Sequence, residues 1–326
     1  MKAIIAEKYG TPDVLRLTEM GKPVPREDEV LVKVHASSLN AYDWHMLTAD
    51  IFLVRLGGRG LLRPKYPILG ADIAGTVEAV GSRVTQFQPG DPVYGDCAGH
   101  GNGSFAEYTT LPESALSVKP ANLSFAQAAA VPMAGVTALQ GLRDVGQIRP
   151  GQRVLVNGAS GGVGTFAVQL AKWSGAEVTA VCSTRNGEQA RSLGADHVID
   201  YTKEDFTQSG QQYDLILAAN GYHPLSAYKR ALAPKGIYVM AGGTMAQIFG
   251  AVLLGGWMSR GGEKKMTNVS AKMNRADLEI LTELLDSGKI VPVIDRIYAL
   301  SEVPDAMRYL GEGHARGKIV ISISGQ

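Results

Sequence analysis

A glycine-rich turn between two apolar segments limits the fold of this chain more than any other stretch. It lies within Arg153 to Val181, which reads RVLVNGASGGVGTFAVQLAKWSGAEVTAV. The apolar run Val154–Val156 before the turn suits a strand that is buried on both faces. The segment after the turn has the apolar spacing of a helix that packs on a sheet, and a second apolar run follows at Val178–Val181. Strand, turn, helix and strand in this order form the unit that holds the pyrophosphate of a dinucleotide.

The residues of the turn indicate what it binds. A helix that begins near Gly162 or Val163 directs unpaired N–H groups and a positive dipole end toward the turn, which favours phosphate. Glycine at 161 and 162 lets the backbone approach a ligand, and Gly164 lets the helix pack closely on the strand. The alternative is a tight turn without a ligand. Because strands and helix flank the turn in the required order, we predict cofactor contacts at Gly158, Ser160, Gly161, Gly162 and Val163.

The loop after the second strand bears on which dinucleotide is bound. An NAD site usually carries Asp or Glu there, which accepts hydrogen bonds from the ribose hydroxyls. Here the loop reads Cys182-Ser183-Thr184-Arg185-Asn186, without an acid. Ser183 can donate a hydrogen bond to a 2′-phosphate and Arg185 can neutralise its charge. The alternative is an ordinary polar loop with a solvated arginine; we predict NADP(H).

Composition excludes several other functions. The 326 residues are enough for two domains, and 32 basic against 31 acidic residues give no support for a nucleic-acid or anionic-membrane partner. Two cysteines, Cys97 and Cys182, are too few for a disulfide framework. The start MKAIIAEKYG resembles neither a signal peptide nor a transit peptide, so we expect a cytoplasmic protein. The longest apolar stretch, Ile248 to Trp257, is too short to span a bilayer, so we expect no integral membrane segment.

The pattern of the sequence changes after about residue 122. Residues 1 to about 122 alternate short β-branched runs with turn signals, which predicts a small barrel of irregular strands. Ser124 is a favoured N-cap type, and helices are predicted through Ala130 and over 134–142. After residue 151 strands and helices alternate, which predicts parallel pairing. The predicted strands are 2–7, 14–18, 30–38, 74–80, 105–110, 154–156, 178–181, 198–199, 213–218, 236–241, 291–299 and 318–322, with a helix at 275–286.

The run NGASGGVG, preceded by PMAGVTALQGL and followed by GADHVIDY, resembles the medium-chain dehydrogenase/reductase superfamily. Within it the chain is most similar to the zinc-free quinone oxidoreductase and zeta-crystallin-like branch, near the bacterial NAD(P)-dependent alcohol dehydrogenase group and the reticulon-4-interacting oxidoreductase. The resemblance covers essentially the whole chain. It implies an α/β fold in which a Rossmann doubly wound parallel sheet domain, 123–288, is inserted in a GroES-like β-barrel catalytic domain, 1–122 and 289–326, with the cleft between them. We also expect a homodimer.

The superfamily divides on zinc. Zinc-dependent members place a Cys, a His and a second Cys around a catalytic metal, and the matching positions here are Asn40, Gly70-Ala71-Asp72 in place of Gly-His-Glu, and Met133. None of these is a thiolate or an imidazole, the ligands that such a site needs. Zinc-dependent members also have a lobe that holds a second zinc ion on four cysteines, and this sequence has no counterpart of that lobe. We therefore expect no metal, and we interpret the scattered histidines as surface or hydrogen-bonded core residues (His35, His45 and His100).

Without a Lewis acid nothing lowers the pKa of an alcohol, so oxidation of a simple alcohol is hard. In a quinone or an α,β-unsaturated ketone, conjugation spreads the developing charge onto oxygen, and the protein mainly supplies orientation and hydrogen-bond donors. By resemblance Asn40 and Asp43 match the Asn-x-x-Asp of zinc-free members. We predict that Asn40 donates to the substrate oxygen, Asp43 holds the nicotinamide ribose or a water, and Tyr42 supplies a proton. Each can instead be a turn-forming or capping residue.

The resemblance implies further cofactor contacts. Thr137 would lie against the nicotinamide ribose or carboxamide, and Tyr201 would join Ser183 and Arg185 at the adenosine end. Asn220 and Gly242, with their glycine neighbours, follow strands whose ends face a ligand crevice. The basic run Gly313 to Lys318, which contains His314 and Arg316, would fold back on the phosphates or form a solvated turn.

For two segments the sequence allows two interpretations each. Residues 46–66 are apolar and basic, and they form either a lid or channel for a lipophilic acceptor or a helix and loop that cover the barrel. Residues 244–267 either line the cleft or form a dimer contact.

The leading interpretation is a zinc-independent, NADPH-dependent oxidoreductase that transfers hydride to a small lipophilic quinone or α,β-unsaturated carbonyl. An NAD(P)-dependent alcohol or aldehyde dehydrogenase is one alternative, against which the missing zinc ligands argue. The other alternative is a non-catalytic NADPH-binding protein, which would show no turnover with any acceptor.

Overall fold

The computed structural model describes residues 1–50, 60–101, 103–243 and 263–323. The chain folds into two compact units. The first unit comprises Met1–Met133, Met273–Gly288 and Pro292–Gln326, and the second comprises Ala134–Lys272 and Lys289–Val291. The predicted apolar stretch 248–257, most of the segment 244–267 and part of the segment 46–66 lie outside the described residues. Within the described ranges no helix is long and apolar enough to cross a membrane.

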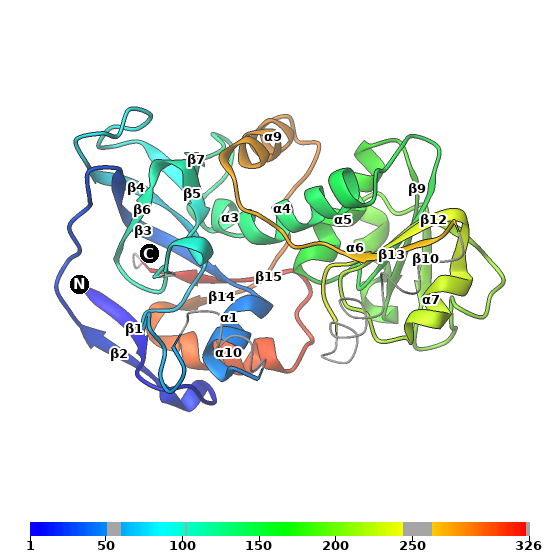
Figure 1. Cartoon of the computed structure of the whole chain (residues 1–326), viewed down its shortest axis with the longest axis horizontal. Helices are drawn as coiled ribbons and strands as arrows, with labels where there is room; N and C mark the ends of the chain where they lie inside the picture. Colours follow the sequence, from blue (N-terminus) through cyan, green and yellow to red (C-terminus); the bar gives the residue numbers. More distant parts are fainter. Residues whose placement is uncertain (51–59, 102, 244–262, 324–326) are drawn as a thin grey trace. The chain divides into compact units, whose positions relative to one another are not determined.

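The first unit is built on a seven-stranded sheet with the order β14-β15-β3-β4-β5-β7, in which β6 also pairs with β3, and on a separate β1-β2 pair. Pairing is antiparallel except between β14 and β15. In Figure 1 the last strand (red) runs beside β3 (blue), so the end of the chain returns to the sheet begun near its start. The strands are β1 Lys2–Ala6, β2 Leu15–Glu19, β3 Glu29–Leu39, β4 Asp72–Val80, β5 Pro92–Asp96, β6 Tyr108–Pro112, β7 Leu116–Val118, β14 Ile294–Ala299 and β15 Lys318–Ser322.

Two apolar clusters hold the first unit together. The alternating valines of β3 (Val30, Val32, Val34) pack with Ile73 and Leu111 on one side of the sheet. The helices of this unit are α1 Ala41–Thr48, α3 Phe125–Ala129, α9 Arg275–Asp286 and α10 Val303–Gly311, and α4 Pro132–Gln140 begins at its boundary. Helix α10 places its apolar residues at positions 303, 306 and 307, one face of a helix, in the second cluster with residues of β1 and β15.

The second unit contains a six-stranded parallel sheet with the order β10-β9-β8-β11-β12-β13. The strands are β8 Arg153–Asn157, β9 Glu177–Cys182, β10 His197–Asp200, β11 Tyr213–Ala218, β12 Leu232–Met240 and β13 Lys265–Asn268, and the helices are α5 Gly162–Trp173, α6 Gly187–Ser192 and α7 Leu225–Ala231. The predicted parallel pairing is confirmed. From β8 the chain moves outward through β9 and β10 and then returns to the other side of β8, so the strand order reverses between β8 and β11.

The domain boundaries at 122 and 288 stay a prediction. In the two compact units the segments 123–133 and 273–288 group with the first unit instead. Helix α9 is tied there because the Tyr94 hydroxyl donates to the Leu278 carbonyl oxygen at 2.8 Å and the Asn122 amide donates to the Leu285 carbonyl oxygen at 2.9 Å. Elements without a predicted counterpart include three strands and two helices (β5, β7, β13, α1 and α10). The three strands are short or begin with proline and α1 has eight residues, so their patterns are weak, whereas α10 has a clear apolar face that the sequence interpretation did not use.

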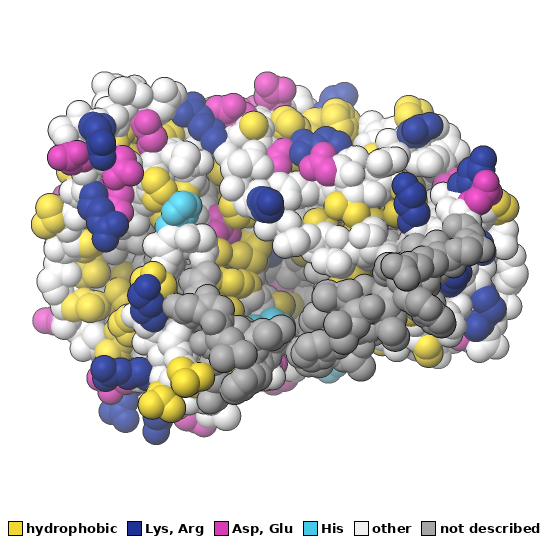
Figure 2. Space-filling model, viewed as in Figure 1, with side chains coloured by type: hydrophobic (Ala, Val, Ile, Leu, Met, Phe, Trp, Pro, Cys, Tyr) yellow, Lys and Arg dark blue, Asp and Glu magenta, His cyan; other side chains and the backbone are white. Residues whose placement is uncertain are grey.

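Charge is spread over the surface rather than segregated. Figure 2 shows basic and acidic side chains interspersed over the described part of the face in view. This distribution agrees with the near-neutral balance of the sequence.

Candidate functional site

The glycine-rich turn follows β8, and two of its glycines are required by the fold itself. Gly158 has φ +85°, a left-handed conformation that favours glycine, and a Cβ there would lie 2.8 Å from the Cβ of Asn220. A Cβ on Gly164 would lie 2.1 Å from the Gly158 carbonyl oxygen. A side chain at Gly158 would therefore push against Asn220, and one at Gly164 would push against the backbone of Gly158.

Gly161 differs from these two glycines. A Cβ built there would meet only the Gly158 carbonyl oxygen, at an ordinary 3.7 Å, and its φ is −82°. The protein itself therefore has room for a side chain at Gly161. The residue is also the N-cap of α5 and provides no side-chain cap for the first N–H groups of that helix. A helix start without a side-chain cap and with open space above its N-cap is suited to an anion.

The turn lies where the strand order reverses. Asn157 and Ala218, the last residues of β8 and β11, are in register, and the Asn220 backbone N–H donates to the Asn157 carbonyl oxygen at 3.2 Å. A Cβ on Gly242 would lie 2.5 Å from the Ala219 carbonyl oxygen. The structure thus brings the predicted residues Gly158, Asn220 and Gly242 to one edge of the sheet, where ligands of open α/β sheets bind.

Asn186, which no prediction included, connects the turn to the loop after β9. Its buried side-chain amide donates to Ser160 Oγ at 3.0 Å and to Ser183 Oγ at 3.2 Å. Each serine oxygen accepts this bond, so each hydroxyl keeps its own hydrogen for another acceptor. The Asn186 amide therefore leaves the hydroxyls of Ser160 and Ser183, two predicted cofactor contacts, able to donate to a ligand. No sequence signal identified Asn186, because an Asn after an Arg in a loop is common.

A carboxylate lies beside this loop, at the end of the neighbouring strand β10. Asp200, in register with Cys182, accepts a hydrogen bond from the Thr184 hydroxyl, and its Oδ2 lies 3.2 Å from Lys203 Nζ. The hydrogen bond from Thr184 is the largest cause of the lowered pKa of Asp200. Its oxygens are thus engaged by the protein. Arg185 is exposed, and Tyr201 is 49% exposed with its ring edge-on to Tyr222, at 6.0 Å between centroids.

A second group of polar residues lies in the first unit at the ends of four adjacent strands, and hydrogen bonds join Lys318, Asn40 and Asp72 into a network. Lys318 begins β15, Asn40 follows β3, Asp72 begins β4 and Asp96 ends β5. The network is buried among apolar strands. Lys318 Nζ donates to Asn40 Oδ1 and to Asp72 Oδ2, the latter at 3.0 Å, and Asn40 Nδ2 donates to Asp72 Oδ2 at 2.9 Å.

Asp72 is the acceptor at the centre of this network. Besides Asn40 and Lys318, the Ser38 hydroxyl donates to its Oδ2 at 2.7 Å and the Met133 backbone N–H donates to its Oδ1 at 2.9 Å. By the resemblance, Asn40 and Met133 match zinc-ligand positions. Both donate to the carboxylate of Asp72, which is also paired with the Lys318 ammonium. The expectation that Lys318 belongs to a basic patch over the cofactor phosphates is wrong, because β15 turns this side chain into the interior.

Asp43 and Tyr42 both have structural partners. Asp43 is fully buried, and its Oδ2 accepts from the Asn40 backbone N–H at 2.8 Å in the capping box of α1. Burial raises the pKa of Asp43 to about 7, against the lowering effect of that hydrogen bond, and the charge of Asp72 raises it further. The Tyr42 hydroxyl donates to the Ala98 carbonyl oxygen at 3.2 Å. Their catalytic roles stay predictions.

Asp96 is a further buried carboxyl, outside the residues predicted from the sequence. Its Oδ1 accepts from the Ala98 backbone N–H at 2.6 Å, while its Oδ2 has no hydrogen-bond partner among the described residues. Burial is the main cause that raises the pKa of Asp96 to about 8, and the charge of Asp72 adds to it. The first unit thus holds protonatable groups beside one buried ion pair.

The remaining predicted contacts are distributed over both units. Thr137 lies within α4 and is largely buried in the second unit. His314 and Arg316 lie in the turn before β15 in the first unit, where the Arg316 backbone N–H donates to Asp295 Oδ2 at 3.1 Å. Their contacts with a cofactor stay predictions.

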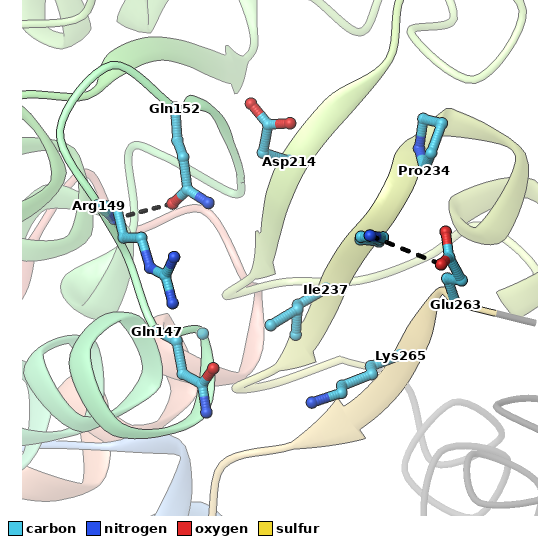
Figure 3. Close-up of a pocket in the computed structure, with 10 residues that line it drawn as sticks. Gln147, Arg149, Gln152, Asp214, Pro234, Ile237, Glu263 and Lys265 are labelled. Carbon is cyan, nitrogen blue, oxygen red and sulfur yellow. Dashed lines mark hydrogen bonds and ion pairs between the residues drawn. The ribbon is translucent and has the colours of Figure 1, made fainter.

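A cavity of about 470 Å³ lies at the other edge of the parallel sheet (Figure 3). Its lining includes Asp214 and Lys265, near the first residues of β11 and β13, whereas the glycine-rich turn follows the last residue of β8. In Figure 3 the dashed lines join Gln152 to the Arg149 backbone and a lysine to Glu263. Because parallel strands present their amino and carboxyl ends at opposite edges, this cavity is not part of the cofactor turn.

Metal-binding geometry is not found in the described ranges, where no group of three or more His, Cys, Asp or Glu side chains is arranged to hold an ion. His35 Nε2 lies 3.0 Å from Thr76 Oγ1, and His45 Nδ1 lies 2.8 Å from Asp50 Oδ1. The absence of a metal requirement stays a prediction.

Comparison with known proteins identifies the family. Residues 26–121 match the family described as the alcohol dehydrogenase GroES-like domain, and residues 193–321 match that described as zinc-binding dehydrogenase. The chain is 38% identical to the 2-methylene-furan-3-one reductase of Solanum lycopersicum, over 98% of this chain and 79% of that protein. The chain belongs to the medium-chain dehydrogenase/reductase superfamily. It is 35% identical to the mitochondrial NAD(P)H oxidoreductase RTN4IP1 of Mus musculus, with 99% and 89% covered.

Among solved structures, the quinone oxidoreductase from Coxiella burnetii resembles this member of the superfamily with a TM-score of 0.87 and 31% identity, over 99% of both chains. The predicted fold class, a Rossmann-like parallel sheet with a GroES-like domain, is confirmed. The chain is an oxidoreductase that uses a nicotinamide cofactor.

Proposed function

We propose that this superfamily member is a zinc-independent, NADPH-dependent oxidoreductase that reduces quinones or α,β-unsaturated carbonyl compounds. NADPH supplies the hydride when it is bound. The observation that carries the proposal is the buried Lys318-Asp72-Asn40 network: Asn40, which matches a zinc-ligand position of zinc-dependent members, is an amide hydrogen-bonded to a carboxylate and an ammonium. The names of the relatives describe quinone and enone substrates, which accept hydride without a metal.

The preference for NADPH rests on the loop after β9. Ser183 is held by Asn186 so that its hydroxyl hydrogen can be donated, and Arg185 is an exposed cation beside it. A 2′-phosphate accepts both kinds of contact. Asp200, the carboxylate at this end, is engaged by Thr184, Thr202 and Lys203, which limits its use for a ribose hydroxyl.

The residues of the first unit would stabilise charge on the acceptor. As hydride adds to the β-carbon of an enone, negative charge builds on the carbonyl oxygen, where a placed N–H donor lowers the barrier. Asn40 is the candidate donor. A proton must then reach the α-carbon of an enone, or the oxygen of a quinone, and Tyr42 and bulk solvent are its candidate sources.

Location and assembly are further proposals. We infer a homodimer, on the strength of the family resemblance alone. Cytoplasmic location stays a prediction, and the mouse relative is named as mitochondrial.

Steady-state NADPH oxidation with a panel of quinones and enones tests the proposed function. We expect turnover with at least one acceptor class, weaker use of NADH, and no dependence on added zinc. Oxidation of simple alcohols with NADP⁺ at a higher kcat/KM would favour the alcohol dehydrogenase alternative. Tight NADPH binding without turnover of any acceptor would favour the non-catalytic alternative.

A further inference from the structure

Lys318 is unusual because it is a buried cation. It is 3% exposed, and among the residues that the structure describes it is the only buried lysine or arginine. Its ammonium has two described acceptors in the first unit, Asn40 Oδ1 and Asp72 Oδ2. Burying a charge is unfavourable unless it is paired and hydrogen-bonded. A lysine in this place therefore requires both partners.

The two ions together fix the orientation of the Asn40 amide. An ammonium only donates hydrogen bonds, so Asn40 must present Oδ1 to Lys318, and an ionised carboxylate only accepts, so Asn40 must present Nδ2 to Asp72. Turning the amide over would set two donors against each other at Lys318 and two acceptors against each other at Asp72. Asn40 cannot satisfy these neighbours in the other orientation.

In this orientation one hydrogen of the amide is bonded only weakly by the protein. One Nδ2 hydrogen goes to Asp72 at 2.9 Å, and the other has the Ser38 carbonyl oxygen at 3.5 Å, the limit of a hydrogen bond. Asn40 is 9% exposed, whereas Asp72 and Ser38 are fully buried. Asn40 is thus the most exposed residue of this group, and the amide hydrogen bonded only at 3.5 Å is the one it can offer to a ligand.

We propose that Lys318 is a positioning residue for the reduction: its ammonium locks Asn40 so that an N–H, and not a carbonyl oxygen, meets the acceptor. This inference rests on the proposed function, because it assigns the acceptor oxygen to Asn40. The charge of Lys318 also withdraws electron density through the amide carbonyl, which makes the N–H a stronger donor. The oxygen of the acceptor then meets a fixed donor as its negative charge develops.

Three variants separate positioning from support of the fold. Lys318→Met removes the ammonium and leaves Asp72 buried without its counter-ion. Lys318→Met with Asp72→Asn removes both charges and avoids that penalty. The matched control is Lys22→Met, which breaks an exposed ion pair with Glu78 in the same unit.

The inference predicts a change in kcat for the acceptor without a change in KM for NADPH. We expect kcat for the acceptor to fall at least tenfold in both Lys318 variants, with KM for NADPH within twofold of the unmodified protein. The Lys22 variant should match the unmodified protein in both. A purely structural Lys318 predicts instead that the double variant, which restores charge balance, recovers most of kcat. Recovery to half of the unmodified value or more would overturn the inference.

A second measurement does not depend on activity. With ¹⁵N-labelled asparagine, the side-chain amide of Asn40, assigned by its loss in Asn40→Ala, should give one sharp pair of signals in the unmodified protein. We expect the pair to broaden or double in both Lys318 variants, because the amide can turn over. An unchanged pair would overturn the inference. If the unmodified protein reduces no acceptor, the proposed function fails, and these spectra alone decide whether Lys318 orients Asn40.

Discussion

Replacing Asp43 by asparagine should raise the free energy of unfolding, relative to the unmodified protein, by more at pH 8 than at pH 5. The reason is that Asp43 is a buried carboxyl whose ionisation opposes folding. Its pKa is raised by burial from 3.8 to about 7. A carboxyl with a raised pKa contributes most to stability below its unfolded pKa, and that contribution is lost as pH rises through the folded pKa. The loss therefore runs from about pH 4 to about pH 7 and is complete at pH 8.

The size of the effect follows from the pKa shift. Each unit of pH between the two pKa values costs a little over 1 kcal/mol, so the two units from pH 5 to pH 7 cost about 3 kcal/mol. In the Asp43→Asn variant the new side chain has no charge to bury, and its amide oxygen can still accept from the Asn40 backbone N–H in the capping box. Any cost of placing the amide nitrogen in that site is the same at both pH values and cancels from the comparison.

Urea unfolding measures this difference. Trp44 adjoins Asp43, so its fluorescence reports on the first unit once the other tryptophans, Trp173 and Trp257, are changed to Phe. With a urea m-value of about 1–3 kcal/mol/M, a difference of about 3 kcal/mol separates the urea midpoints of the variant and the unmodified protein by about 1–3 M more at pH 8 than at pH 5. Asp28→Asn, at an exposed carboxyl in the same unit, is the control. Equal midpoint differences at both pH values would refute the reasoning, since a buried ionising carboxyl cannot give that result.

Further changes test the cofactor turn and the metal prediction. Gly161→Ala should leave thermal stability unchanged, because its Cβ meets nothing closer than 3.7 Å, yet weaken NADPH binding measured by calorimetry at least tenfold; unchanged affinity would contradict an anion at the start of α5. Gly164→Ala should lower the free energy of unfolding by about 1–3 kcal/mol, because its Cβ would lie 2.1 Å from a carbonyl oxygen, and a stable variant would show that this contact relaxes. Arg185→Gln should raise KM for NADPH about tenfold, the loss of one charged hydrogen bond of about 1.4 kcal/mol, and leave KM for NADH unchanged; equal effects on both would remove the 2′-phosphate assignment. Prolonged dialysis against a strong chelator should leave kcat unchanged, and loss of activity that zinc restores would show a metal enzyme.

The strand-turn-helix unit could be predicted because its information is local. Glycine positions, apolar runs and crossover spacing all lie within Arg153 to Val181, and the strands β8 and β9 follow them. Helix α9 has the predicted bounds, since Asn274 caps its start and its apolar residues recur at helical spacing. By contrast, β7 has three residues and β5 begins with proline, so neither carries enough alternation to be recognised.

The polar network could not be predicted in the same way, because its members are far apart in the sequence. Asn40 and Lys318 are separated by 278 positions, and only the pairing of β15 with β3 places them side by side. Lys318 follows a basic turn, which favours its interpretation as part of a surface patch. The run after it, Ile319 to Ile321, is buried at every position, which indicates a strand covered on both faces and so an inward first residue.

The electrostatics of the first unit follow from how its hydrogen bonds are divided. Asp72 accepts from Ser38, Asn40, Lys318 and the Met133 backbone, which uses the acceptor capacity of an ionised carboxylate. Asp43 and Asp96 each receive one backbone N–H and have one buried oxygen without a partner in the described part of the chain. Because the ammonium and most of the donors are committed to Asp72, burial raises the pKa of the other two carboxyls to about 7 and about 8. Below those pKa values the network therefore holds one ion pair among neutral acids, and it does not oppose negative charge on an acceptor that binds Asn40.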